Sequence, residues 1–170
     1  MRPGSLPLTL ALVAAAAVLQ TTLFGDGRVQ PFGASPALVT LIVIATVRFL
    51  EPEQGLLVAF TAGLLMDLLG ASPLGLWAIA MTTIGYLTLR VRHQADRGIL
   101  VVAAGVFGLA FLGNALFSIA GTLFGQRTLI NPDPLRLMVL PALYTMILAA
   151  AVIPGMAKLL MRGREASWKL

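Results

Sequence analysis

The chain has 170 residues, about the length of one domain. Hydrophobic residues make up 58% of it and charged residues only 11%, where a soluble domain carries roughly 25%, and its mean hydropathy is +0.92. This composition excludes a soluble domain and, because disordered chains are poor in apolar residues, a disordered one. The chain has no cysteine and one histidine, His93, which excludes disulfides, thiolate metal sites and a histidine-rich metal centre.

Six apolar segments follow one another along the chain, divided by Pro, Gly and charged residues. A membrane-spanning helix needs about 20 mostly apolar residues, with a range of about 17–25. We therefore predict an all-α integral membrane protein with a single transmembrane domain over residues 1–170 and six spans, at 6–24, 37–50, 55–69, 74–89, 99–124 and 135–161. The second and third segments are short, so they either span with help from flanking residues or form a tight re-entrant pair.

The first segment resembles a signal peptide, with Arg2 before an alanine-rich run. It has no clear polar cleavage region, so a retained helix is expected. Ala11 and Ala15 place two small side chains one turn apart on this helix. Such spacing lets helices approach closely, either within the bundle or at a contact with another protein.

Helix starts are predicted where a capping residue precedes a proline. The cap oxygen accepts an otherwise unpaired N–H, and proline at the first helical position lacks an N–H that would be unpaired there anyway. Such pairs precede the second, fourth and sixth segments, and a Glu-Pro pair precedes the third: Ser35-Pro36, Ser72-Pro73, Asp133-Pro134 and Glu51-Pro52. Glu53 then lies near the positive end of the third helix, where an anion is favoured.

Asp67 is the one acidic residue placed inside a predicted span, about one turn from the end of the third helix. A carboxylate deep in a span costs on the order of 2.5–3.5 kcal/mol, so a partner is expected. The nearest is the N-terminus of the fourth helix, whose backbone N–H groups Asp67 is expected to bridge, locking the hairpin. The alternatives are contact with a partner protein or with a polar ligand.

Asn114 lies near the middle of the fifth segment, where a polar side chain often bonds across helices. Small residues form one face of the same segment, and Ala59 and Gly63 do so on the third. These faces suit either helix packing within the bundle or contact with another protein. The members on the fifth segment are Ala104, Gly108, Ala115, Ser118, Thr122 and Gly125. The sixth segment contains Pro141 and Pro154, which are expected to kink it.

Basic residues are distributed unequally between the two sides of the predicted bundle. The side that holds both termini carries nine of the 12 Lys and Arg residues, which predicts that this side is cytoplasmic. A basic rim over anionic lipid accounts for the net charge of +5 without a nucleic-acid partner. The nine are Arg2, Arg48, Arg90, Arg92, Arg97, Lys158, Arg162, Arg164 and Lys169.

Chemistry-bearing motifs are missing from the sequence. It has no Ser–His–Asp arrangement, no pair of close carboxylates in a span, no phosphate loop and no metal-ligand cluster. We therefore expect no catalytic residues, no metal and no cofactor. Because an intramembrane proton relay needs several ionisable groups and only Asp67 qualifies, a transporter driven by its own ion coupling is not expected either.

The central third of the chain resembles the rod shape-determining protein MreD family. The resemblance lies in Gly63-Leu-Leu-Met-Asp67-Leu-Leu-Gly70, the Pro73-Leu-Gly75 helix start, and Tyr86-Leu followed by Arg90. It implies that Asp67, Pro73 and Gly75 are motif residues, with Gly63, Tyr86 and Arg90 as weaker matches; Gly70 and Asn114 complete the candidate site residues. It also implies a helical arrangement similar to the substrate-binding subunits of energy-coupling-factor transporters.

The resemblance implies a non-enzymatic subunit of the bacterial inner membrane that binds MreC and, through it, joins MreB, RodA and a class B transpeptidase in cell-wall elongation. The alternative function is the vitamin-binding subunit of an energy-coupling-factor transporter, which the span count and Ala11-x-x-x-Ala15 fit. Few aromatic and polar residues lie in the predicted outer loops to hold a vitamin: Phe32, Trp77 and Arg127.

Overall fold

The computed structural model describes residues 6–24, 36–70, 73–92, 99–124 and 134–166, and every regular element in these ranges is an α-helix. The predicted all-α class is confirmed for this part of the chain. The helices are α1 (Leu6–Phe24), α2 (Leu38–Val47), α3 (Pro52–Leu69), α4 (Leu76–Val91), α5 (Ile99–Leu123) and α6 (Pro134–Ala166).

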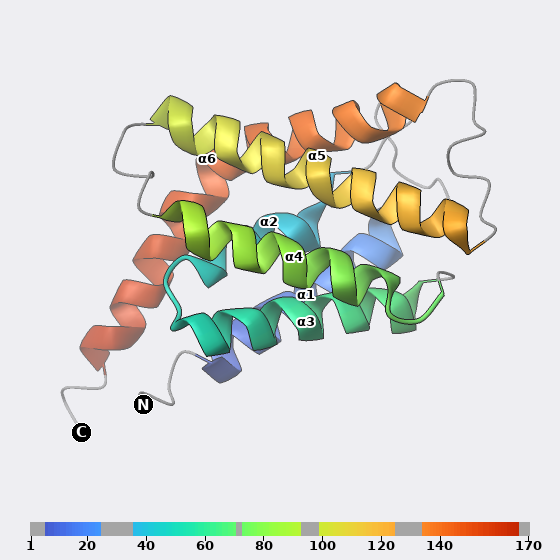
Figure 1. The fold of residues 1–170 in the computed structure, drawn as a ribbon. Coiled ribbons are helices and arrows are strands. Elements are labelled where there is room, and N and C mark those ends of the chain that lie inside the picture. The colour runs from blue at the N-terminus through green and yellow to red at the C-terminus, as the bar shows by residue number, and fades with distance from the viewer. Residues whose placement is uncertain (1–5, 25–35, 71–72, 93–98, 125–133, 167–170) are drawn as a thin grey trace.

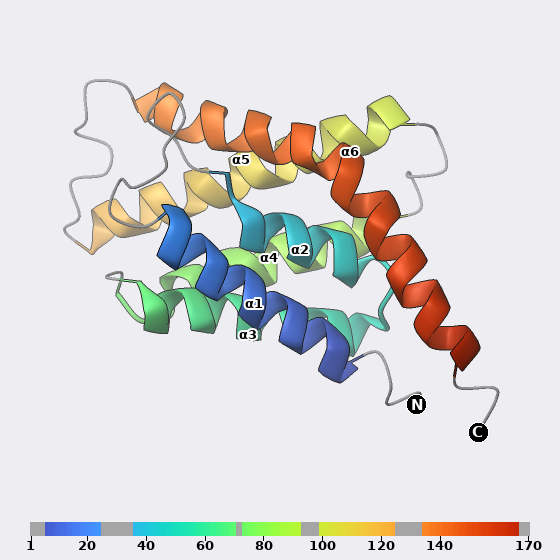
Figure 2. The same cartoon turned by 180° about the vertical axis from the view of Figure 1, so that it is seen from behind.

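The helices run back and forth along one bundle, and α1 begins at the same end of it as α6 finishes (Figures 1 and 2). The same end holds the finish of α2 and of α4, which carry Arg48 and Arg92 as their C-caps. We call it the arginine end. The opposite end holds the junction between α3 and α4 near Asp67, and we call it the Asp67 end.

Helix α2 is the short central helix, and it packs against all five others. Eight of its ten residues are buried. Many of them are β-branched, which disfavours an isolated helix, so burial of its apolar surface on every side is what holds this segment helical. The hydrophobic core is built around it, with Leu41, Val43 and Val47 among its fully buried side chains.

The N-terminus of α2 is capped by side chains of other helices. Its N-cap residue is Ala37, which has no capping side chain. Instead, Gln20 Oε1 of α1 accepts the N–H of Val39 at 2.9 Å, and Thr145 Oγ1 of α6 accepts the N–H of Ala37 at 3.2 Å. The same hydroxyl donates to the carbonyl of Pro141 at 2.6 Å. These bonds satisfy donors that the helix cannot pair itself.

Removing either of these caps is expected to destabilise the bundle without changing its apolar core. Gln20→Leu or Thr145→Val leaves one N–H of α2 without its acceptor, and we expect each to lower the free energy of unfolding by about 1–2 kcal/mol. Thermal unfolding in detergent measures the loss. The matched controls repeat the same two changes of residue type on α3, as Gln54→Leu and Thr61→Val. Thr61 donates only to Leu57 within its own helix, so its loss removes no bond between helices. Equal losses in controls and variants would contradict the cross-helix caps.

Two of the four predicted proline starts are confirmed. Pro52 is the first residue of α3 and Pro134 the first of α6. The predictions for the other two helices are wrong, because α2 begins at Leu38 after Pro36 and α4 begins at Leu76 after Pro73. Glu51 is the N-cap of α3, but its side chain makes no capping bond. Ser35, Ser72 and Asp133 lie outside the described residues.

Three helical segments of the described part are long and apolar enough to cross a membrane: Pro52–Leu69, Leu100–Leu123 and Met138–Gly155. The apolar segments of the other three helices are shorter, and α2 with 10 residues is about 15 Å long, half the thickness of a bilayer core. Six complete spans therefore stay a prediction.

Helix α6 contains Pro141 and Pro154 within its length, as expected, and Figures 1 and 2 show that it bends. Each proline removes one backbone hydrogen bond and crowds the preceding turn. The bend lets the first part of α6 lie beside α5 while its last turns lead away from the bundle (Figure 2).

Candidate functional site

The carboxylate of Asp67 is buried between α3 and α4, with only 3% of the residue exposed. It accepts three backbone hydrogen bonds from the start of α4. Oδ2 accepts the N–H of Gly75 at 2.9 Å and that of Ala78 at 3.1 Å, and Oδ1 accepts the N–H of Trp77 at 3.0 Å. The bridge expected from the sequence is therefore present.

Helix α4 starts without a capping side chain of its own, and Asp67 supplies what is missing. The N-cap is Gly75, at φ +97°, a left-handed conformation that glycine adopts without steric cost. The chain reaches it through a turn in which the N–H of Leu76 bonds to the carbonyl of Pro73 at 3.3 Å. Asp67 then pairs N–H groups of the first turn that have no partner within the helix.

The electrostatics of this contact favour a carboxylate. An anion at the N-terminus of a helix is stabilised by the partial positive charge of its unpaired N–H groups. Here the partial positive charge comes from the N-terminus of α4. It offsets the partial negative charge at the C-terminal end of α3, the helix that carries Asp67. No cluster of three metal-ligating side chains occurs among the described residues.

Close contact between the backbones of α3 and α4 depends on Gly63. A Cβ atom added at this position would overlap the carbonyl oxygen of Trp77 and the backbone of Ala78. Gly63 and Asp67 are four residues apart, on one face of α3, so the same turn of α4 lies over both. Further along, a Cβ at Gly85 would lie 2.6 Å from the Cβ of Ala59. The small-residue face of α3 is used for packing within the bundle.

The other candidate residues are not gathered at this site. Tyr86 and Arg90 lie on the exposed side of α4 toward the arginine end, where Arg90 Nε donates to Tyr86 Oη at 3.0 Å. Arg90 also lies over the Tyr86 ring at 5.5 Å. Gly70 is the exposed C-cap of α3 with an ordinary extended backbone. The structure thus joins Gly63, Asp67, Pro73 and Gly75 at one end of the hairpin and leaves the remaining residues elsewhere.

The cross-helix bond expected of Asn114 is not made by its amide nitrogen. Nδ2 is buried and has no hydrogen-bond partner among the residues that the structure describes. Neighbouring helices α4 and α5 meet instead through aromatic stacking, with the rings of Trp77 and Phe117 4.3 Å apart. The ring of Trp77 is half-buried in this stack.

Two small-residue faces stay open, unlike that of α3. Ala11 and Ala15 are exposed on α1, while Val13, Ala16 and Ala17 on its other side are buried. Ala104 and Gly108 are exposed on α5, and the next members of that face, Ala115, Ser118 and Thr122, are half-buried. Gly125 lies outside the described residues.

Sequence reasoning missed Gln20 and Thr145, whose only signal is that each is a polar side chain inside an apolar helix. Either helix alone gives no indication of what the side chain caps.

Comparison with known proteins identifies the family. No curated protein and no solved structure matches the chain, so the similarity to substrate-binding subunits of energy-coupling-factor transporters stays a prediction. The family model described as rod shape-determining protein MreD matches residues 4–162, nearly the whole chain. The match extends well beyond the Asp67 hairpin and includes all six helices apart from the last residues of α6. The chain belongs to the rod shape-determining protein MreD family.

Proposed function

We propose that this chain is a non-enzymatic scaffold of the bacterial cell-wall elongation complex that binds MreC within the inner membrane and helps to maintain cell shape. The observation that carries the proposal is the match to the MreD family, which suggests a role in rod shape determination. Through MreC, the chain would join MreB, RodA and a class B transpeptidase. The excess of basic residues on the side of the two termini supports a cytoplasmic location for both.

A scaffold role agrees with how the site is used. Asp67, the one carboxylate within a predicted span, is engaged by three backbone N–H groups that fix one helix to the next. Its chemistry is that of an internal clamp, which gives the α3–α4 hairpin a defined shape. A scaffold needs such a rigid surface, whereas a catalyst needs a reactive group open to a substrate.

The exposed face of α1 is our proposed contact with the transmembrane helix of MreC. Leu8, Ala11, Ala15, Val18 and Thr22 follow one another at helical spacing and are all exposed. In lipid, helices associate by close packing, and small residues at the centre of a face let two backbones approach. Ala11 and Ala15 occupy that central place, with larger side chains above and below them.

Co-purification with MreC tests this function. The chain and the MreC from the same genome are co-expressed, extracted in detergent and captured through a tag on one of them. We expect the pair to co-purify, and we expect Ala11→Leu with Ala15→Leu to lower the recovered MreC about tenfold by separating the helices, which corresponds to ~1.4 kcal/mol. Cells that depend on this variant should become wider and rounder.

Ala150→Leu with Ala151→Leu is the matched control, because both alanines are exposed on α6. It makes the same two changes of size on another helix and should leave the MreC yield unchanged. If wild-type chain and MreC never co-purify and depletion leaves cell width unchanged, the proposed function is wrong. If the wild-type pair forms and the α1 variant binds normally, binding stands but the assigned face does not.

A further inference from the structure

A cavity of about 410 Å³ opens at the arginine end of the bundle, between the ends of α2 and α4 and the first turns of α5. Its walls are almost entirely apolar, with Ile44 and Val91 on one side and Val102 and Leu109 on the other. Space is left on the α5 side of the cavity, because Ala104, Gly105 and Gly108 contribute little or no side chain. Built Cβ atoms at Gly105 and Gly108 would meet nothing within 4 Å.

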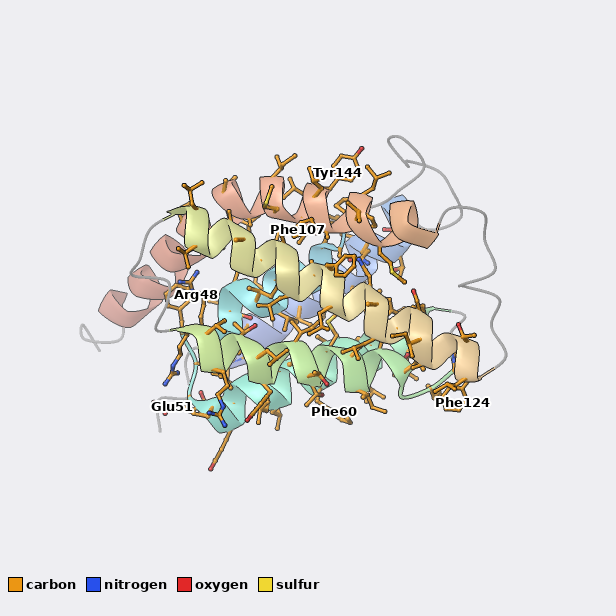
Figure 3. All side chains as sticks on the ribbon, turned by 45° about the horizontal axis from the view of Figure 1, so that its top comes forward. Arg48, Glu51, Phe60, Phe107, Phe124 and Tyr144 are labelled. Atoms are coloured by element: carbon orange, nitrogen blue, oxygen red, sulfur yellow. The ribbon has the colours of Figure 1, made fainter. Side chains whose placement is uncertain are left out.

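Two guanidinium groups line this apolar cavity, those of Arg48 and Arg92. Figure 3 shows Arg48 at the end of the bundle where α4 finishes and α5 begins. Arg92 Nη1 donates to the carbonyl of Leu50 at 3.4 Å, and the Cζ of Arg48 lies 5.8 Å from the ring centre of Phe49. Among the described residues neither forms an ion pair. Because a guanidinium has five N–H donors, most of the donors of both groups stay available to a ligand.

The position of these arginines has a local explanation that accounts for only part of the arrangement. Each is the C-cap of its helix, where a cation is favoured by the helix dipole. That reason applies to any solvated position at the helix end. It does not explain why both side chains border one cavity whose remaining walls are apolar.

We propose that this cavity binds one anionic phospholipid, with an acyl chain against the apolar wall and the headgroup phosphate between Arg48 and Arg92. A cavity of this size and character suits an apolar ligand with one charged group. Arginine recognises phosphate through paired N–H donors, and the attraction is strong where water is scarce. The site lies at the end of the bundle that the basic residues assign to the cytoplasmic leaflet, where anionic lipids are abundant.

Native mass spectrometry of the purified chain tests the proposal. Phosphatidylglycerol or phosphatidylcholine with identical acyl chains is added to the protein in detergent, and the bound fraction is measured. We expect phosphatidylglycerol to bind at least about tenfold more tightly, and Arg48→Gln or Arg92→Gln to weaken it about tenfold, the effect of ~1.4 kcal/mol. Gly105→Leu, which fills the cavity from its open wall, should abolish the bound lipid while thermal stability is retained.

Matched variants separate this site from a general effect of charge or bulk. Arg90→Gln removes the same charge two residues from Arg92, at an exposed position outside the cavity, and should leave binding unchanged. Gly155→Leu adds the same side chain at another glycine with open space and should do the same. The proposal is overturned if phosphatidylcholine binds equally well, if Arg90→Gln matches Arg92→Gln, or if Gly105→Leu retains the lipid.

A protein helix in the cavity is the competing occupant. If co-expressed MreC displaces phosphatidylglycerol from the wild-type chain, the cavity is a protein contact and the lipid proposal is wrong. The lipid measurement itself uses the chain without MreC, so its result does not depend on the proposed function.

Discussion

Asp67→Leu is expected to lower the free energy of unfolding by about 3–5 kcal/mol. The leucine removes the acceptor of three N–H groups at the start of α4, and each donor left buried costs about 1–3 kcal/mol. Asp67→Asn keeps one acceptor oxygen but loses the negative charge, so a smaller loss of about 1–3 kcal/mol is expected. Thermal unfolding in detergent should rank wild type, Asn and Leu in that order, with the Leu variant on the order of 10 °C below wild type.

Glu53→Leu provides the control for this series. Glu53 is exposed in the first turn of α3, so the same loss of a carboxylate from the same helix should change stability little. A fully stable and functional Asp67→Leu chain would show that the bridge is dispensable. An Asp67→Asn chain that stays folded but no longer supports rod shape would instead assign Asp67 a second role, in contact with a partner.

Gly63→Ala is expected to be as damaging, although it adds a single methyl group. The new Cβ would occupy the place of the Trp77 carbonyl oxygen and the Ala78 backbone. Backbone atoms cannot rotate aside as the end of a side chain can, so α3 and α4 must separate and the bonds to Asp67 lengthen with them. We expect a loss of about 3 kcal/mol or more, at or above the upper range for overpacked cores.

Gly105→Ala is the matched glycine variant for that experiment. It is also within a helix, but its added Cβ meets nothing within 4 Å. Since alanine favours the helix over glycine by roughly 0.5–1 kcal/mol, this control should be neutral or slightly stabilising. The two variants can be compared by size-exclusion chromatography and thermal unfolding in the same detergent. Similar behaviour of both would contradict the close approach of α3 and α4.

Much of the architecture can be predicted from the sequence, because apolar runs and their breaks are local features. The first span coincides with α1 at both ends, and the fifth and sixth begin within one residue of α5 and α6. The bridge from Asp67 can be predicted too, since a carboxylate in an apolar helix needs donors and the next helix start, a few residues later, offers them. The family resemblance in the same hairpin agrees with the match over residues 4–162.

The starts of α2 and α4 cannot be predicted from the neighbouring residues alone. Ser-Pro pairs suggest that α2 and α4 cap themselves, yet neither begins at its proline. Their first N–H groups bond to Gln20, Thr145 and Asp67, which come from other helices. Gln20 and Thr145 lie 19 and 108 positions from the N–H groups that they accept, so no spacing pattern in the sequence reveals these two caps.

The sequence by itself determined that this protein is helical and apolar, where its helices lie and which end of the bundle is basic. Only the tertiary structure decided which helix faces pack against another helix and which stay exposed. The small residues of α3 pack against α4, whereas those of α1 and some of those of α5 stay exposed. The tertiary structure also brings two arginines to one cavity. The reason is physical: helix formation follows from local hydrogen bonding and hydropathy, but the neighbour of each face is set by how all six helices pack at once.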